Sequence, residues 1–459
     1  MKKYIAKNIC AAAAVALTLS SCGSNFLDED PYQDMDIEQA IQKPADIQIA
    51  LNGEYFVMGY YNLYGRTMVA MADVSSDVVD FTSTTNHFSS IFNYTYNEND
   101  AYLSGIWEDA YRVIDHSSRV ILKANKMLKA TPDDAVILDG LSQAHALRAM
   151  CTFAIANIYA PRYEAENENA LGAVLVETPI GLTEQVSRAT LKDTYAYILK
   201  ELNKAEEYSA SLKFTNAYML NKAAIAALKA RVYLYMGDFA TAKTYAENAI
   251  AYRGGSLANT EKKYVDMYDD LAQSSEYIYT VAKSQDDYLS ANSINTLYGN
   301  YGFSVAKRVQ ALYGEGDIRK GLASREGGKF SKAVSHVPVI RLSEMYLVMA
   351  ECDAQGGSTA VAADTLFQVA KRNPAIASVA DLPTDKAGLL AFIAEERQRE
   401  LVQEGHRLFD VRRTKETIKV SGGTATLTDG NYLFPIPASE INTNQGVEQI
   451  PGWAAYRPK

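Results

Sequence analysis

The segment from Ile393 to Arg413 carries five acidic and five basic side chains, and it constrains the fold more than any other stretch. The acidic residues are Glu395, Glu396, Glu400, Glu404 and Asp410, and the basic residues are Arg397, Arg399, Arg407, Arg412 and Arg413. Apolar side chains recur between them, so part of this charge must lie against the protein. We expect a helix that Gly405 breaks, a buried run at 408–411, and ion pairs that fix the register. The alternative is a solvated helix, in which a pair such as Glu396 with Arg399 contributes only about 0.5 kcal/mol.

Two long amphipathic helices are predicted in the first half of the chain. The first stripe has alternating steps of three and four and consists of Trp107, Tyr111, Ile114, Ser118, Ile121, Asn125 and Leu128. The second stripe consists of Leu141, Ala144, Arg148, Cys151, Ile155 and Ile158, and Pro161 should end its helix. These two helices should pair with each other. Thr190 and Asp193 fit a capping box that opens the next helix.

Small residues mark a further helical hairpin that resembles a tetratricopeptide unit. They lie at Ala226, Ala230, Gly237, Ala242, Ala246 and Ala249, with Tyr233 among them, and Gly237-Asp238 should form the turn. Another hairpin is predicted from Leu342 to Ala370, with its turn at Gly356-Gly357. The predicted fold is therefore all-α, with helical hairpins stacked into a short solenoid and a C-terminal segment packed back onto them.

Two long insertions, at about 73–100 and 282–334, interrupt this helical pattern. They combine aromatic residues with hydroxyl, amide and acidic side chains, the mixture that a sugar ring requires because one of its faces is apolar and its edge is polar. The candidate ligand-binding aromatics are Phe88, Phe92 and Tyr94 in the first insertion and Tyr298 and Tyr301 in the second. The alternative is that these rings anchor the loops to the helices.

The N-terminus is typical of an exported lipoprotein. Lysines precede an apolar run at Ile9–Leu19, which suits a signal peptide over residues 1–21. Leu19-Ser20-Ser21-Cys22 resembles a bacterial lipobox, so Cys22 is the expected lipidation site and residues 22–35 the anchor and tether. An ordinary signal peptide with an incidental cysteine is the alternative.

Composition excludes several other classes. Loss of the three leader lysines takes the formal charge from −10 to −13, and an acidic chain without a basic run disfavours nucleic acid. Cys151 and Cys352 fall in apolar helical patterns and should be buried thiols. The sequence has no phosphate loop, metal-ligand cluster or nucleophile elbow, so we expect no cofactor, no metal and no enzyme activity.

Four motifs resemble the SusD/RagB family of outer-membrane nutrient-binding lipoproteins. They are ERQRELVQEGHRLFDVRR (396–413), IRLSEMYLVMAECD (340–353), NYLFPIPASEI (431–441) and QIPGW (449–453). Asn444-Gln445 and Ile450 depart from the family pattern, which usually has Asn-Pro and an Asn at these places. The resemblance implies one SusD-like domain over 36–459, with ligand sites built from the inserted loops and with an acidic residue near Asp77 contributing.

The resemblance also implies a function. Such a protein faces the cell exterior on a lipid anchor in the outer membrane. It captures an oligosaccharide or polysaccharide and passes it to a TonB-dependent SusC-like transporter. Two alternatives stay open: a peptide ligand, as in the RagB branch, or a surface glycoside hydrolase, because a pair of catalytic carboxylates has no fixed sequence spacing.

Overall fold

The computed structural model describes residues 40–82, 85–181, 183–210, 212–270, 272–428 and 433–459. The predicted signal peptide, the Cys22 lipidation site and the tether lie outside these residues. Helices form most of the described structure, which confirms the predicted class. None of the helices in these ranges has the length and apolar character needed to cross a membrane.

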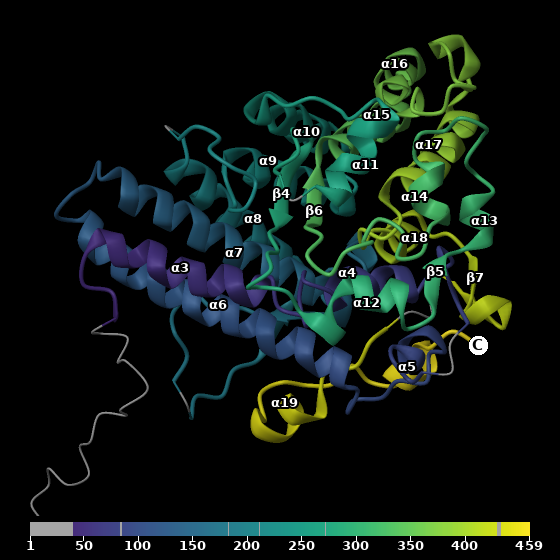
Figure 1. Ribbon diagram of the computed structural model, residues 1–459. Helices are drawn as coiled ribbons and strands as arrows, with labels where there is room; N and C mark the ends of the chain where they lie inside the picture. Colours follow the sequence, from purple (N-terminus) through teal and green to yellow (C-terminus); the bar gives the residue numbers. More distant parts are fainter. Residues whose placement is uncertain (1–39, 83–84, 182, 211, 271, 429–432) are drawn as a thin grey trace, which may run out of the picture.

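Four long helices lie side by side in the first half of the chain (Figure 1). They are α3 (Pro44–Met58), α6 (Ala101–Leu128), α7 (Ala135–Tyr159) and α8 (Leu191–Tyr208). Helices α6 and α7 pack as the predicted pair. The Thr190 side chain accepts a hydrogen bond from the Asp193 amide, so the predicted capping residue does open α8.

The two predicted hairpins also form. Helix α9 (Lys222–Met236) turns at Gly237 into α10 (Phe239–Arg253), and α15 (Leu342–Gln355) turns at Gly356-Gly357 into α16 (Thr359–Ala370). Gly237 adopts φ +77°, a left-handed conformation that glycine reaches without a steric penalty. The small side chains of Ala242, Ala246 and Ala249 on α10 are fully buried, which lets α9 and α10 approach closely. Helix α10 packs on α15, so the hairpins form a continuous row.

The predicted all-α class included no strands, but short strands form four antiparallel pairs in the described residues. The pairs are β1 (Val79–Phe81) with β5 (Phe303–Val305), β2 (Leu171–Val174) with β3 (Arg188–Thr190), β4 (Tyr277–Val281) with β6 (Val337–Arg341), and β7 (Ile418–Val420) with β8 (Ala425–Leu427). Each pair has two strands, so none of them forms a sheet that could act as a layer of the fold.

Short helices occupy much of the remaining chain, including both insertions. They are α4 (Thr67–Val74), α5 (Ser89–Phe92), α11 (Glu261–Asp269), α12 (Ile294–Gly299), α13 (Lys307–Gln310), α14 (Lys320–Ser324) and α19 (Ala438–Thr443). The insertions are thus less irregular than the sequence predicted. Strand β1 comes from the first insertion and β5 from the second, so their pairing joins the two.

The charged C-terminal segment folds as two helices, α17 (Lys386–Leu401) and α18 (Arg407–Thr414). The prediction that Gly405 ends the first helix is wrong, because α17 ends four residues earlier. Gly405 instead allows a close approach to α4, since a Cβ on it would lie 2.9 Å from the Cα of Val69. The expected burial of the following run is confirmed, with Leu408 and Val411 fully buried.

Ion pairs of this segment lie inside the protein. Glu400 is fully buried among three arginines, with oxygen to nitrogen distances of 2.9 Å to Arg341, 2.5 Å to Arg372 and 3.2 Å to Arg319. The Glu396–Arg399 pair, at 2.7 Å, is buried as well. Partial burial was therefore the correct interpretation of the charge pattern, and the solvated helix was not.

Candidate functional site

The two insertions meet beside the charged segment. Strands β1 and β5 pair through Val79 with Val305 and Phe81 with Phe303. Arg308 of the second insertion lies 2.5 Å from the Asp77 carboxylate of the first, and its Nε donates to the Asp77 carbonyl oxygen at 2.7 Å. The backbone pairing and the ion pair together hold the inserted loops as one surface.

A tyrosine-rich turn between α3 and α4 supplies a third part of this surface. The turn needs glycine at Gly65, where a Cβ would lie 2.1 Å from the Gly59 carbonyl oxygen. It places the rings of Tyr60 and Tyr61 4.3 Å apart, both partly exposed. Arg66, which directly follows Gly65, points its guanidinium group at the Tyr61 ring, 5.1 Å from the centroid.

Arg66 sits beneath this surface among aromatic rings. Its guanidinium also lies 5.3 Å from the ring of Phe88 and 5.9 Å from that of Tyr102. Its Nη1 donates to the side-chain oxygen of Asn292 at 3.1 Å, while no carboxylate among the described residues forms an ion pair with it. Burial lowers the pKa of Arg66, because a charged group in this setting loses hydration. Its interactions are thus mainly with π-faces and one amide.

His87 and Tyr301 form the exposed part of the junction. Their rings stack at 3.7 Å with an interplanar angle of 9°, and both residues are partly exposed. The Tyr301 hydroxyl donates to the carbonyl oxygen of Ala291 at 3.0 Å, which fixes the ring. Tyr301 also raises the pKa of Arg66, so these side chains belong to one electrostatic environment. A flat, oriented ring with an accessible face is what stacking against a ligand requires.

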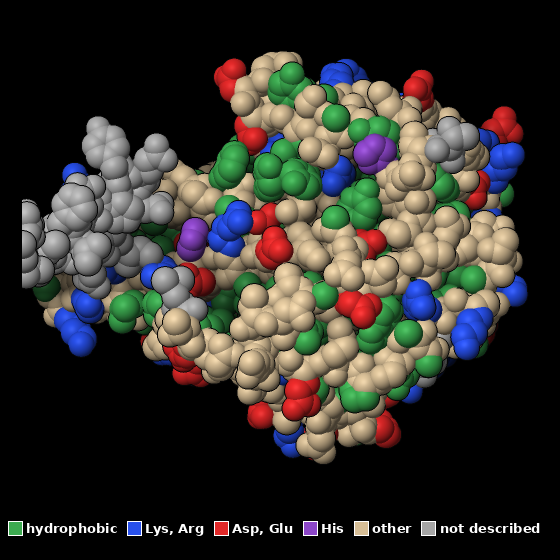
Figure 2. All heavy atoms as spheres, turned by 90° about the horizontal axis from the view of Figure 1, so that it is seen from below, with side chains coloured by type: hydrophobic (Ala, Val, Ile, Leu, Met, Phe, Trp, Pro, Cys, Tyr) green, Lys and Arg blue, Asp and Glu red, His purple; other side chains and the backbone are tan. Residues whose placement is uncertain are grey.

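Exposed aromatic rings continue from this junction onto α3. Phe56 is 59% exposed, and its ring lies 6.1 Å from that of Tyr60. Beside it lies an open groove of about 320 Å³, lined in part by Tyr55, Tyr218, Tyr279, Asn52 and Asp287. On the face of the molecule that is seen from below, hydrophobic side chains form several separate patches with charged side chains between them (Figure 2). We call the set Phe56, Tyr60, Tyr61, His87 and Tyr301 the aromatic surface.

The structure places the predicted site residues differently from one another. Phe88, Phe92, Tyr94 and Tyr298 are between 1% and 5% exposed and pack in the core beneath the insertions. Asp77 is held by Arg407 and Arg308. Of the five predicted aromatic residues, Tyr301 is the one with a partly exposed ring. Ligand contact by any of them stays a prediction, and Tyr301 is the residue that a ligand can reach without rearrangement.

Sequence reasoning missed Tyr60, Tyr61, Arg66 and His87. A signal for the first three was present, because 59–66 places three tyrosines between two glycines and an arginine directly after the second glycine. No comparable signal marked His87, whose role depends on stacking against a residue more than two hundred positions away. In the described part of the chain, no group of His, Cys, Asp and Glu could hold a metal ion.

Comparison with known proteins identifies the class. A model of the SusD family matches residues 190–453, and a model described as starch-binding associating with outer membrane matches residues 25–234. The first match alone spans more than half of the chain. The protein therefore belongs to the SusD family.

Individual relatives agree with this assignment over almost the whole length. The chain is 22% identical to SusD-like protein P2 of Formosa agariphila, covering 97% of this chain and 99% of the relative. A SusD superfamily structure from Bacteroides thetaiotaomicron superposes with a TM-score of 0.79 at 21% identity, covering 89% of this chain and 100% of that one. A SusD-like carbohydrate binding protein from Bacteroides vulgatus gives a TM-score of 0.75 at 20% identity, covering 91% and 99%.

Proposed function

We propose that this protein binds an oligosaccharide or polysaccharide at the cell surface and delivers it to a SusC-like TonB-dependent transporter. The observation that carries the proposal is the aromatic surface, whose exposed and partly exposed rings lie at the junction of the two insertions and on the neighbouring turn and α3. Sugar rings stack on such faces, while flanking groups such as Asn292 and Asp287 offer hydrogen bonds to hydroxyls. A family model and a structural relative are described in terms of starch and carbohydrate binding, which supports the same ligand class.

The proposal places the protein on the outer membrane, facing the exterior, with a lipid on Cys22. The Leu19–Cys22 motif supports the anchor, and the family description supports the membrane. Incorporation of a labelled fatty acid into the wild type but not into Cys22→Ala would establish the lipid. Co-purification of a TonB-dependent channel from outer membranes would establish the partner, and its absence would contradict the delivery step.

Glycan binding is tested on the soluble chain that starts after Cys22. Calorimetric titration with a panel of polysaccharides and oligosaccharides should give saturable binding without release of reducing ends. Tyr301→Ala should weaken the affinity by about 5- to 30-fold, since loss of a stacking ring costs roughly 1–2 kcal/mol. The matched control is Tyr252→Ala, which removes an exposed tyrosine ring on α10 and should leave the affinity unchanged.

The same titration separates the alternatives. Saturable binding of peptides instead of glycans would select the RagB-like function. Cleavage of a glycan by the wild type would show a hydrolase and contradict the proposed binding role. Glycan binding that Tyr301→Ala leaves intact would keep the ligand class and contradict the placement of the site.

A further inference from the structure

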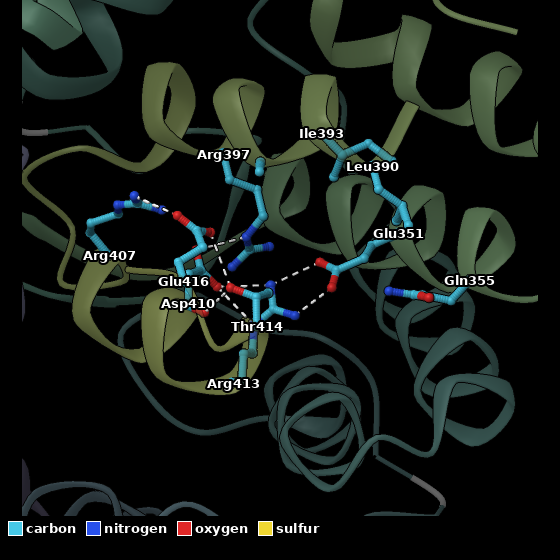
Figure 3. A pocket seen from close by; sticks show the side chains of 11 residues that line it. Glu351, Gln355, Leu390, Ile393, Arg397, Arg407, Asp410, Arg413, Thr414 and Glu416 are labelled. Atoms are coloured by element: carbon cyan, nitrogen blue, oxygen red, sulfur yellow. Dashed lines mark hydrogen bonds and ion pairs between the residues drawn. The ribbon is translucent and has the colours of Figure 1, made fainter. Parts of the chain in front are cut away.

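A second pocket, of about 260 Å³, lies between α15, α17 and α18 (Figure 3). It shares no residue with the aromatic surface or with the groove beside it. Its lining is Glu351, Gln355, Leu390, Ile393, Ala394, Arg397, Arg407, Asp410, Arg413, Thr414 and Glu416. Leu390, Ile393 and Ala394 of α17 therefore form an apolar part of the lining, and the other lining residues are polar or charged.

Most charged groups of this lining already satisfy one another. Asp410 accepts from Arg397 Nε at 2.8 Å and from Arg413 Nε at 2.9 Å. Glu351 accepts hydrogen bonds from both terminal nitrogens of Arg413. Glu416 accepts from Arg407 at 2.8 Å and from the Thr414 hydroxyl at 3.0 Å. The carboxylates are thus occupied by donors of the protein itself.

Arg397 is the exception on the donor side. The residue is 4% exposed, and its Nη1 has no hydrogen-bond acceptor among the described residues. Burial acts to lower the pKa of Arg397, but Asp410 more than offsets it, so the guanidinium stays charged. In Figure 3 this group lies at the centre of the lining, below Ile393 and above Arg413. A buried charged donor without an acceptor is costly, so an acceptor group from outside would be stabilised there.

We propose that this pocket binds a small organic carboxylate, one oxygen of which accepts from Nη1 of Arg397 while its carbon skeleton packs on Leu390, Ile393 and Ala394. Because Nε of Arg397 already donates to Asp410, Nη1 is the donor left for a ligand, and a charged N–H gives a carboxylate oxygen a stronger hydrogen bond than a neutral donor does. The volume is slightly below the range of about 300–1,000 Å³ that holds drug-sized ligands. The ligand is therefore no larger than one sugar acid or amino acid.

The charge balance of the lining sets the expected affinity. Its three arginines are matched by three carboxylates, so a bound anion adds one uncompensated negative charge. We expect a dissociation constant on the order of 1 mM, which corresponds to about 4 kcal/mol. Binding should weaken at high salt, because part of the attraction is electrostatic.

The test uses sodium glucuronate as the probe and glucose as its neutral counterpart of similar size. Saturable glucuronate binding, followed by calorimetry, should occur near 1 mM, and glucose should not compete with it. Ala394→Phe should reduce glucuronate affinity at least tenfold by filling the pocket. Ala391→Phe, on the exposed side of the same helix, is the matched control and should bind as the wild type does.

Two further variants keep the result decisive. Arg397→Lys retains the charge but cannot bond Asp410 and a ligand from separate nitrogens, and it should also weaken binding about tenfold while the melting temperature shows that it folds. Tyr301→Ala should bind glucuronate normally, because the aromatic surface is separate. The proposal is overturned if the wild type shows no saturation, if glucose competes equally, or if Tyr301→Ala abolishes binding that Ala394→Phe retains.

Discussion

Arg407 donates two hydrogen bonds to the carboxylate of Asp77, of 2.8 Å from Nε and 3.3 Å from Nη2, across 330 positions of sequence. Arg308 binds the same carboxylate from the second insertion. Burial alone would raise the pKa of Asp77, but the two arginines lower it below its ordinary value. One carboxylate therefore connects the first insertion, the second insertion and the charged C-terminal segment.

Asp77→Asn should loosen this junction. The variant keeps the size of the side chain but leaves Arg407, which is 6% exposed, with Glu416 as its one remaining ionic partner among the described residues. We expect a loss of about 2–3 kcal/mol in the free energy of unfolding, measured by denaturant titration. Glycan affinity should fall as well, because the insertions that carry Tyr301 and His87 would lose the ion pair that reinforces the β1–β5 pairing between them.

The control for this junction is Asp286→Asn, which removes an exposed acid from the second insertion. It changes the net charge by the same amount, and we expect an effect within about 0.5 kcal/mol. Equal effects of the two variants would show that net charge matters and that the Asp77 contacts do not.

Glu400→Gln should be the most destabilising neutral substitution on α17. It removes the charge that Arg319, Arg341 and Arg372 share in the interior, and buried pairs broken on one side cost about 3–5 kcal/mol. Glu395→Gln, on the same helix, removes the charge of a side chain that is 53% exposed and pairs with Arg399 at 3.4 Å. It should cost less than about 1 kcal/mol. Comparable losses in chemical denaturation would contradict the role assigned to the buried network.

Periodicity predicted the helical scaffold because the spacing of apolar residues depends on local geometry. The α6 and α7 stripes, the Thr190 cap and the glycine turns of both hairpins all lie within segments of fewer than thirty residues. The end of α17 could not be found in this way. A glycine such as Gly405 often ends a helix, but here glycine is needed because the backbone of Val69 lies against it. Only the tertiary fold brings Val69 near.

The candidate site was less predictable for the same physical reason. A loop aromatic can face a ligand or the core, and residue type does not distinguish the two. Phe88 stacks on Tyr102 at 3.9 Å and is buried, whereas its neighbour His87 stacks on Tyr301 at the surface. The direction of each ring follows from pairings between the insertions, such as β1 with β5, which have no local sequence signal.

Glu54 should make stability fall as the pH rises. Burial raises the pKa of Glu54 from 4.5 to about 8, although the hydrogen bond from Ser117 lowers it in part. Between these values the unfolded chain loses the proton and the folded chain keeps it, so the free energy of unfolding falls by up to about 1.4 kcal/mol per pH unit. Glu54→Gln should flatten this dependence between about pH 5 and 8, measured by denaturant titration at each pH.

Glu108→Gln provides the control for Glu54, because it removes an exposed carboxylate from α6. Its pH dependence should follow that of the wild type. Asp73, whose pKa burial raises to about 7, acts in the same direction and should leave a residual slope in Glu54→Gln. An unchanged slope in Glu54→Gln would show that Glu54 is ionised in the folded protein.

Gly405→Ala and Gly422→Ala separate backbone strain from steric contact. Both glycines have positive φ, +79° and +63°, so alanine costs about 1–2 kcal/mol at either position. At Gly422 a Cβ meets nothing within 4 Å, whereas at Gly405 it lies 2.9 Å and 3.0 Å from backbone atoms of Val69. Because α4 cannot yield there without moving Arg66 and the tyrosine turn, Gly405→Ala should cost at least about 2 kcal/mol more than Gly422→Ala in denaturant unfolding. It should also weaken glycan binding, which Gly422→Ala should leave intact. If the two variants lose the same stability, the contact between the charged segment and α4 is loose, and the C-terminal segment does not position the aromatic surface.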